Sequence, residues 1–296
     1  MKFLPGISIA LSLSAGSAVA GEGAFGWLYS LDLQPQGKVE IEQRVDRTHR
    51  QAAGRYDWTQ FRTAVEYGLT NELQMGVYLN AFSLDANANY LSSEMCDTVP
   101  CTAGFGVPGT AANGPYRRSG VDGGSLEFIW RLSNPVTSPV GVGLYLEPSW
   151  GKLEDTVEAR LLLQSNFLDD RLILLTNAMV EWEREKYDRA GGIIRNTMAD
   201  LLYGASYRFA PRWSAGLEGR LHTDHDGYRF QRHTQTGHFI GPNVHYASER
   251  WWATAAWRHQ VSGSCYSVGT ADCSMGRVWD GHGRDQFMLK VGYLLN

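Results

Sequence analysis

The sequence predicts a closed, antiparallel, up-and-down transmembrane β-barrel of about twelve strands, and three observations support this fold class. Segments of roughly ten residues alternate polar and apolar side chains with period two. The connections between these segments alternate between short and long. No part of the chain offers the roughly 18 consecutive apolar residues of a spanning helix. Strands of this kind place one face against lipid and the other against a polar interior.

The hairpin over Thr59–Leu84 shows the alternation most clearly. Phe61 and Val65 share one parity, whereas Arg62 and Glu66 share the other. The same criterion, applied in order along the chain, predicts strands over about 37–48, 58–69, 72–84, 123–133, 139–150, 154–165, 171–184, 196–209, 212–224, 237–247, 251–262 and 285–295.

Turn chemistry and aromatic residues give these strands a direction. Residues 69–72, 134–138, 167–170, 210–211 and 248–250 are short, turn-rich connections of the kind found on the periplasmic side. An even number of strands then places both termini on that side. Aromatic residues of the outward parity predict two interfacial girdles. The members are Tyr67, Tyr207, Phe209, Trp213, Tyr246, Trp251 and Tyr293 near the short turns, and Trp150 and Trp182 near the opposite ends.

The first residues carry the features of a secretion signal. Lys2 supplies a positive charge, residues 3–13 are apolar, and Ala18-Val19-Ala20 forms a small-residue cleavage site. We therefore expect a signal peptide over 1–20 and a barrel over 37–296. The segment between them, 21–36, is expected to be periplasmic or tucked into the barrel end. The predicted location is a bacterial outer membrane.

The last predicted strand resembles the C-terminal signal that the outer-membrane assembly machinery reads. Lys290, Gly292 and Leu295 match its polar, glycine and hydrophobic positions, although the usual terminal Phe is absent. Over its mature length the chain resembles the porin-like outer-membrane barrels of Gram-negative bacteria, in a family without a characterised function. The resemblance implies outer-membrane lipid, lipopolysaccharide and the assembly machinery as partners. It implies architecture rather than activity, and no oligomeric state.

The net charge of the chain limits its possible partners. A net charge of −4 gives no basis for nucleic-acid binding.

Cys96 with Cys101, and Cys265 with Cys273, form two local pairs in predicted external loops, so two loop disulfides are expected. Zinc binding is the alternative, but the two pairs lack the usual spacing. The longest loop, about 85–121, either folds over the mouth as a lid or packs into the lumen.

The inward parity is charged with both signs, nine acids against ten bases. Two interpretations stay open: the charges pair and close the lumen, or they line a narrow, weakly selective pore. The members are Glu40, Glu42, Glu66, Glu127, Glu147, Glu158, Glu181, Glu183 and Glu218, with Lys38, Arg44, Arg62, Arg131, Arg160, Arg171, Arg208, Arg220, Arg258 and Lys290.

Histidines cluster in the last quarter of the chain. The run His222-Thr223-Asp224-His225-Asp226 contains metal-ligand types, but on a strand His225 points away from His222 and Asp224, so polar lumen and loop histidines are favoured. No metal or other cofactor is predicted.

The prediction is therefore a non-enzymatic outer-membrane barrel, a channel for small polar solutes. One alternative is a non-conducting barrel that acts through its loops. The other is a lipid hydrolase using His259 near Ser262, for which no complete triad is recognisable.

Overall fold

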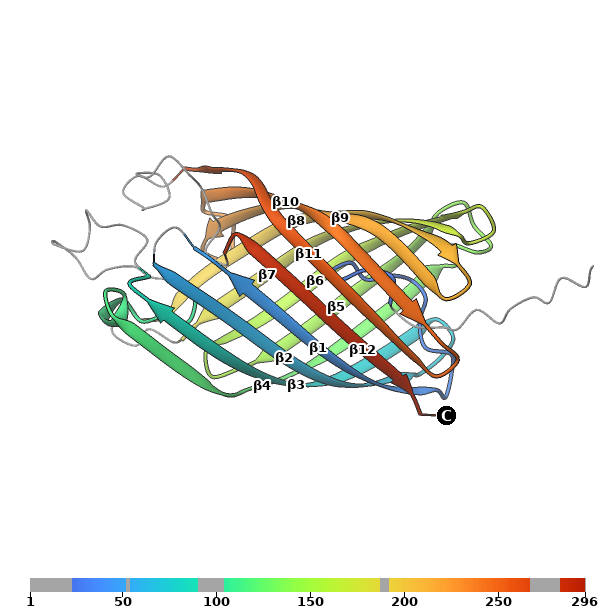
Figure 1. Cartoon of the computed structure of the whole chain (residues 1–296), viewed down its shortest axis with the longest axis horizontal. Helices are drawn as coiled ribbons and strands as arrows, with labels where there is room; N and C mark the ends of the chain where they lie inside the picture. The colour runs from blue at the N-terminus through green and yellow to red at the C-terminus, as the bar shows by residue number, and fades with distance from the viewer. Residues whose placement is uncertain (1–22, 52–53, 90–103, 187–191, 267–282, 296) are drawn as a thin grey trace, which may run out of the picture.

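The computed structural model describes residues 23–51, 54–89, 104–186, 192–266 and 283–295, and it confirms the closed antiparallel twelve-strand barrel (Figure 1). Each strand pairs with its sequence neighbours, and β1 closes the barrel against β12. Besides the strands, residues 109–111 form a short 3-10 helix (Gly109–Ala111). The strands are β1 (Val39–His49), β2 (Arg55–Gly68), β3 (Leu73–Asn87), β4 (Pro115–Ser133), β5 (Gly141–Trp150), β6 (Glu154–Phe167), β7 (Leu172–Glu185), β8 (Ile194–Ala210), β9 (Trp213–Asp226), β10 (Arg232–Ala247), β11 (Trp251–Cys265) and β12 (Asp285–Leu294).

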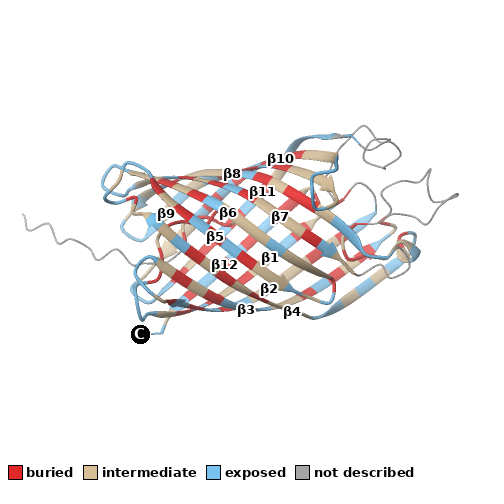
Figure 2. Cartoon of the chain, turned by 180° about the vertical axis from the view of Figure 1, so that it is seen from behind, coloured by how far each residue is buried: buried red, intermediate tan, exposed pale blue. Residues whose placement is uncertain are grey.

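The register places opposite chemistry on the two faces of the wall. Ile41 pairs with Val65 and Val65 with Val77, and these exposed side chains form an apolar row on the outside. The neighbouring row runs from Glu40 to Glu66, which are both buried. Figure 2 shows this alternation of buried and exposed residues along the strands. The core therefore lies in the lumen, as the period-two pattern requires.

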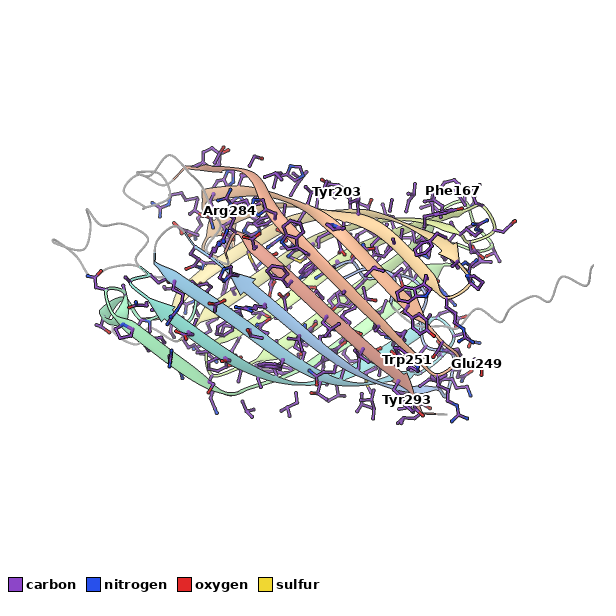
Figure 3. All side chains as sticks on the ribbon, viewed as in Figure 1. Phe167, Tyr203, Glu249, Trp251, Arg284 and Tyr293 are labelled. Atoms are coloured by element: carbon purple, nitrogen blue, oxygen red, sulfur yellow. The ribbon has the colours of Figure 1, made fainter. Side chains whose placement is uncertain are left out.

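The short connections meet at one end of the barrel, called here the short-turn end: residues 69–72, 134–140, 168–171, 211–212 and 248–250. The opposite end is called the long-loop end. At the short-turn end, Trp251 pairs with Tyr293 and Trp213 with Tyr246, and Figure 3 shows Trp251 and Tyr293 at that end of the wall. No helix among the described residues is long and apolar enough to cross a bilayer.

Four strands begin earlier than the sequence predicts: β4 by eight residues, β10 by five, β2 by three and β8 by two. Residues 115–121 pair with β3, where Asp85 lies opposite Arg117 and also accepts a hydrogen bond from its Nε at 3.1 Å. The exposed side chains here include Arg117 and Ser119, so the outward apolar half of the alternation is lost while the backbone pairing continues. The described part of the long loop, 104–114, packs inward: Phe105 and Val107 contact Trp58 and Leu84 on the inner face.

Candidate functional site

The N-terminal segment 23–36, called here the plug, lies inside the short-turn half of the barrel. Figure 1 shows it as a blue trace within the barrel at the end that carries the C terminus. Phe25, Leu28 and Leu31 are each only 1% exposed. Of the two positions that the sequence leaves open for this segment, the structure therefore has the one inside the barrel end.

Side chains of the wall, rather than strand pairing, hold the backbone of the plug. Glu218 accepts hydrogen bonds from the amides of Gly26 (2.8 Å) and Trp27 (3.0 Å). Asn177 accepts from the amide of Tyr29 (2.8 Å) and donates to its carbonyl (3.1 Å). Two more amides of the plug donate to wall side chains, Leu31 to Gln164 (2.7 Å) and Gln34 to Gln74 (2.7 Å). Two arginines donate to carbonyls of the plug, Arg131 to Leu31 (3.1 Å) and Arg160 to Trp27 (3.0 Å). The only β-bridge of the plug joins Gln36 to Gly68.

Sequence reasoning missed the amides among these residues, Asn177, Gln164 and Gln74. All three have the inward parity and are fully buried or nearly so. An uncharged amide at an inward position is a usable signal, because it offers both a donor and an acceptor to a backbone. The identity of the backbone that uses them depends on the tertiary structure.

The apolar side chains of the plug divide between two clusters. Phe25 and Leu28 pack with Leu175, Met179 and Leu202. Tyr29, Leu31 and Leu33 pack with Ile129, Tyr145 and Leu162. Glycines in the wall make room for them: a Cβ at Gly143 would lie 2.5 Å from a methyl of Leu31, and one at Gly204 would lie 2.8 Å from the Phe25 ring.

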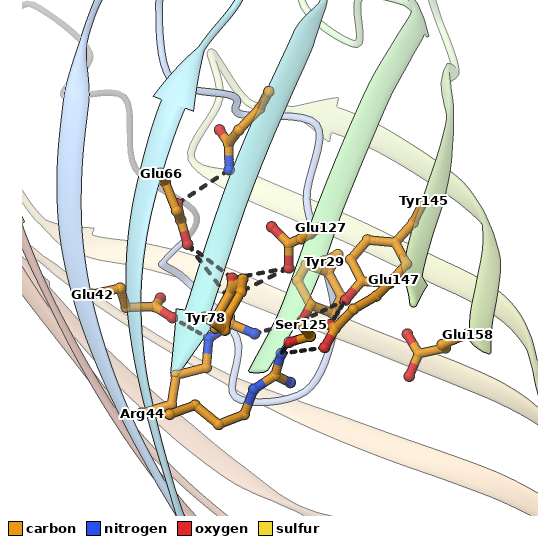
Figure 4. Close-up of polar contacts among 12 residues, drawn as sticks. Tyr29, Glu42, Arg44, Glu66, Tyr78, Ser125, Glu127, Tyr145, Glu147 and Glu158 are labelled. Carbon is orange, nitrogen blue, oxygen red and sulfur yellow. Dashed lines mark hydrogen bonds and ion pairs between the residues drawn. The ribbon is translucent and has the colours of Figure 1, made fainter. Parts of the chain in front are cut away.

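Tyr29 connects the plug to a network of charged groups beyond it (Figure 4). Arg44 donates to Tyr29 Oη and to Tyr78 Oη (2.9 Å), and it forms an ion pair with Glu42. Tyr78 Oη lies 3.1 Å from Glu66 and 2.9 Å from Glu127. On the other side of Tyr29, Tyr145 Oη is 3.1 Å away and also contacts Glu147, which is paired with Arg62.

The structure places the predicted lumen charges as follows. Buried are Glu40, Glu42, Arg44, Glu66, Glu127, Glu218, Arg220, Arg258 and Lys290; half-buried are Arg62, Arg131, Glu158, Arg160 and Glu181. Many belong to ion pairs, such as Arg160 with Glu158 at 2.6 Å. Arg131, Arg160 and Glu218 also bind the plug, a role that the sequence does not indicate. Whether these residues line a conducting pore stays a prediction.

Two titratable groups of the plug have shifted pKa values. Burial raises the pKa of the Tyr29 hydroxyl above its ordinary value, although the nearby Arg44 opposes the shift, so Tyr29 stays a neutral hydrogen-bonding phenol. Burial also raises the pKa of Asp32, against the opposing effects of a hydrogen bond from Gln164 and the charge of Arg131.

Beyond the plug lies a cavity of about 240 Å³, bounded by Trp27 of the plug and by Phe105 of the long loop. The indole of Trp27 donates to Asp46 (2.9 Å), and the Arg258 guanidinium lies 4.1 Å from the centre of its ring. The cavity is lined by eight carboxylates and four guanidinium groups, a clear acidic excess. The carboxylates belong to Asp46, Asp122, Glu147, Glu154, Glu158, Glu181, Glu183 and Asp200, and the guanidinium groups to Arg62, Arg160, Arg220 and Arg258.

Two of the clustered histidines, His222 and His259, pair with acidic groups. His222 lies 2.7 Å from Asp200 and 3.1 Å from Asp224, both measured from its ring nitrogens. His259 lies 2.6 Å from Asp285, a partner that the sequence does not indicate. Within the part of the chain that the structure describes, Ser262 makes no hydrogen bond to His259, and no group of three or more His, Cys, Asp or Glu side chains is arranged to hold a metal ion.

The predicted disulfides fall largely outside the described residues. Cys96, Cys101 and Cys273 lie there entirely, and of Cys265 the structure describes only the backbone at the end of β11. Both pairings therefore stay predictions.

Together, the closed wall, its apolar exterior and its polar interior define a membrane-barrel protein with an internal plug. This is the fold of outer-membrane channels: the chain is similar to the COG4313 outer membrane channel from Pseudomonas putida F1 with a TM-score of 0.56 and 9% identity, covering 88% of this chain and 97% of that one. The KdgM porin in complex with disordered oligogalacturonate (TM-score 0.47, 9% identity, 86% and 98% covered) and the NanC porin (0.48, 8%, 86% and 98%) are less similar in structure.

The chain belongs to the family of unknown function DUF6662, whose model matches residues 17–295. A comparison with curated proteins gave no match. The likeness to the solved channels is one of fold, and it assigns no solute.

Proposed function

We propose that this protein is an outer-membrane channel for small polar solutes, with periplasmic termini and a resting state that the plug closes. The observation that carries the proposal is the way the plug is held. Its backbone is bound by side chains such as Asn177, Gln164 and Glu218, so it can leave the lumen without breaking the hydrogen bonds between the strands. The polar cavity beyond Trp27 is then the remaining part of a path through the barrel.

The resting state is closed for a physical reason. The plug carries buried apolar side chains, and its amides are hydrogen-bonded by buried side chains of the wall. Undocking exposes both to solvent at once, which keeps the closed population dominant. Spontaneous openings should therefore be brief and rare in the wild-type protein.

Conductance in planar bilayers tests this proposal. The wild-type protein should conduct rarely, and the double variant Asn177→Ala/Gln164→Ala should open far more often, because the plug loses three backbone hydrogen bonds. The matched control is Asn80→Ala, an inward amide that makes no hydrogen bond to the plug in the described structure. A folded double variant that stays silent would contradict the channel and favour the non-conducting barrel.

A specific observation also supports that second candidate. The network around Arg44, Tyr78 and Glu127 joins β1, β3 and β4 along one side of the interior, and these hydrogen bonds would remain after the plug has left. In the second candidate, such pairing keeps the lumen closed and the barrel acts through its external loops. Loop replacements that alter surface binding while conductance stays absent would support this role.

A further inference from the structure

Two neighbouring strands carry half of the eight carboxylates that line the cavity. Glu154 and Glu158 on β6, with Glu181 and Glu183 on β7, all line it and are called here the acidic wall. Glu158 lies directly opposite Glu181 in the register, and Glu183 lies opposite Thr156, diagonal to Glu154. Like charges at such positions repel each other, because the side chains are only about 5–8 Å apart at their Cβ atoms.

Within the described chain, the acidic wall is poorly neutralised. Arg160 is paired with Glu158, but no described side chain forms an ion pair or hydrogen bond with Glu183, which is only 6% exposed. Glu154 likewise has no such partner among the described side chains. Two other basic groups of the cavity form ion pairs with carboxylates outside the acidic wall: Arg62 pairs with Glu147, and Arg220 pairs with Asp200. A buried carboxylate without a partner is costly, and a bound cation would remove that cost.

We propose that the acidic wall binds a small solute that carries an ammonium group. An ammonium group donates three hydrogen bonds and can share them among carboxylates on two strands. It also suits a wall whose carboxylates are not grouped as a metal centre in the described structure. The cavity of about 240 Å³ limits the solute to a small molecule.

Arg258, which also lines the cavity, is placed to bind a second functional group of such a solute. Arg258 is buried, donates to Gln286 and lies over Trp27, and no described carboxylate lies within ion-pair distance of it. β11, which carries Arg258, lies across the barrel from the acidic wall in the strand order. The ammonium group can therefore belong to a diamine or to a zwitterion whose carboxylate reaches Arg258.

Equilibrium dialysis of the full-length protein in detergent micelles tests the site with three probes of one chain length: putrescine, 4-aminobutanoate and 1,4-butanediol. We expect at least one ammonium probe to bind and the uncharged diol not to bind. Glu183→Gln should weaken binding by roughly tenfold or more, since a charge-assisted hydrogen bond is lost. The control Glu249→Gln, in the turn at the opposite end (Figure 3), should leave binding unchanged.

Folding is monitored in the same samples. Glu183→Gln removes a repelling charge, so its thermal stability should equal or exceed that of the wild type. Tighter binding of 4-aminobutanoate assigns the second group of the solute to Arg258, and tighter binding of putrescine assigns it to further carboxylates; both results support the site. Equal binding of the diol, absence of binding by both ammonium probes, or an equal effect of the two variants would overturn it.

The inference rests on the proposed channel for the route by which solute reaches the cavity, but its test is independent of conductance. Conductance without ammonium binding would overturn the site alone. Binding without conductance, even in the plug variants, would overturn the channel alone.

Discussion

Replacing Asn177 with alanine should loosen the plug while leaving the barrel wall intact. Asn177 is fully buried, and its amide makes two hydrogen bonds to Tyr29, one with the amide and one with the carbonyl. Each bond contributes about 1 kcal/mol net, so the variant should weaken docking by about 2 kcal/mol, or roughly thirtyfold in the docking equilibrium. The peptide groups left without a partner inside the lumen can only increase this cost.

Chymotrypsin provides the assay, because it cleaves after aromatic residues and the plug carries Phe25, Trp27 and Tyr29. When undocking is fast relative to cleavage, the cleavage rate follows the undocked population. The N-terminal fragment released by Asn177→Ala should therefore appear about thirty times faster than from the wild type. Intact-mass measurement identifies the cut, and heat-dependent gel mobility verifies that the barrel stays folded.

Asn80→Ala serves as the control, since Asn80 is an inward amide whose hydrogen bond goes to Ser125 instead of the plug. It should cleave at the wild-type rate. Equal cleavage rates for Asn177→Ala and Asn80→Ala would refute the docking argument. So would acceleration that appears only together with loss of the folded barrel.

Three further predictions follow from the same structure. Leu31→Ala should weaken plug docking by about 2–4 kcal/mol, because it opens a space in a close-packed cluster; unchanged chymotrypsin cleavage would contradict this. The raised pKa of Asp32 means that the docked plug binds a proton more tightly than the free plug, so docking is strongest at low pH and weakens as the pH rises through the raised pKa. Open probability in bilayers should therefore increase with pH, and Asp32→Asn should flatten this dependence; an unaltered slope in the variant would exclude Asp32 as its source. Val65→Arg on the apolar exterior should destabilise the barrel in lipid by up to about 2–4 kcal/mol, whereas Val136→Arg in a turn should cost little, as measured by denaturant unfolding in liposomes. Equal stability of the two arginine variants would argue against lipid contact at Val65.

The wall of this barrel was largely predictable, and particular residues show why. Val65 and Glu66 are neighbours in sequence, but Val65 faces the outside of the barrel and Glu66 faces the lumen. The period-two pattern of each strand therefore predicts which of its side chains face outward and which face inward. The prediction weakened where that contrast ends. Residues 115–121 pair with β3 beyond the apolar band, and their polar sequence resembled a loop.

The candidate site was less predictable, because its contacts join residues that are far apart in sequence. Counted along the strands, the inward charges looked balanced. In the structure, Arg131 binds the plug and Arg44 belongs to the network around it. The cavity holds four of the counted acids and four of the counted bases, and its acidic excess comes from four carboxylates that the count left out: Asp46, Asp122, Glu154 and Asp200. An acidic wall is a property of neighbouring strands, so it appears only once β6 and β7 are in register.

The sequence by itself determined the barrel, its strand order and the chemistry of its two faces, because these depend on local alternation and on the lengths of the connections. Only the tertiary structure decided what fills the lumen. Residues 23–36 alternate only over the short stretch 29–34 and carry a single charge, so their sequence does not indicate where they lie. Their place depends on amides such as Asn177 and Gln164, more than 130 residues away. Such long-range pairing is specified by complementary shape and hydrogen bonding, which become visible only when the wall has closed around the segment.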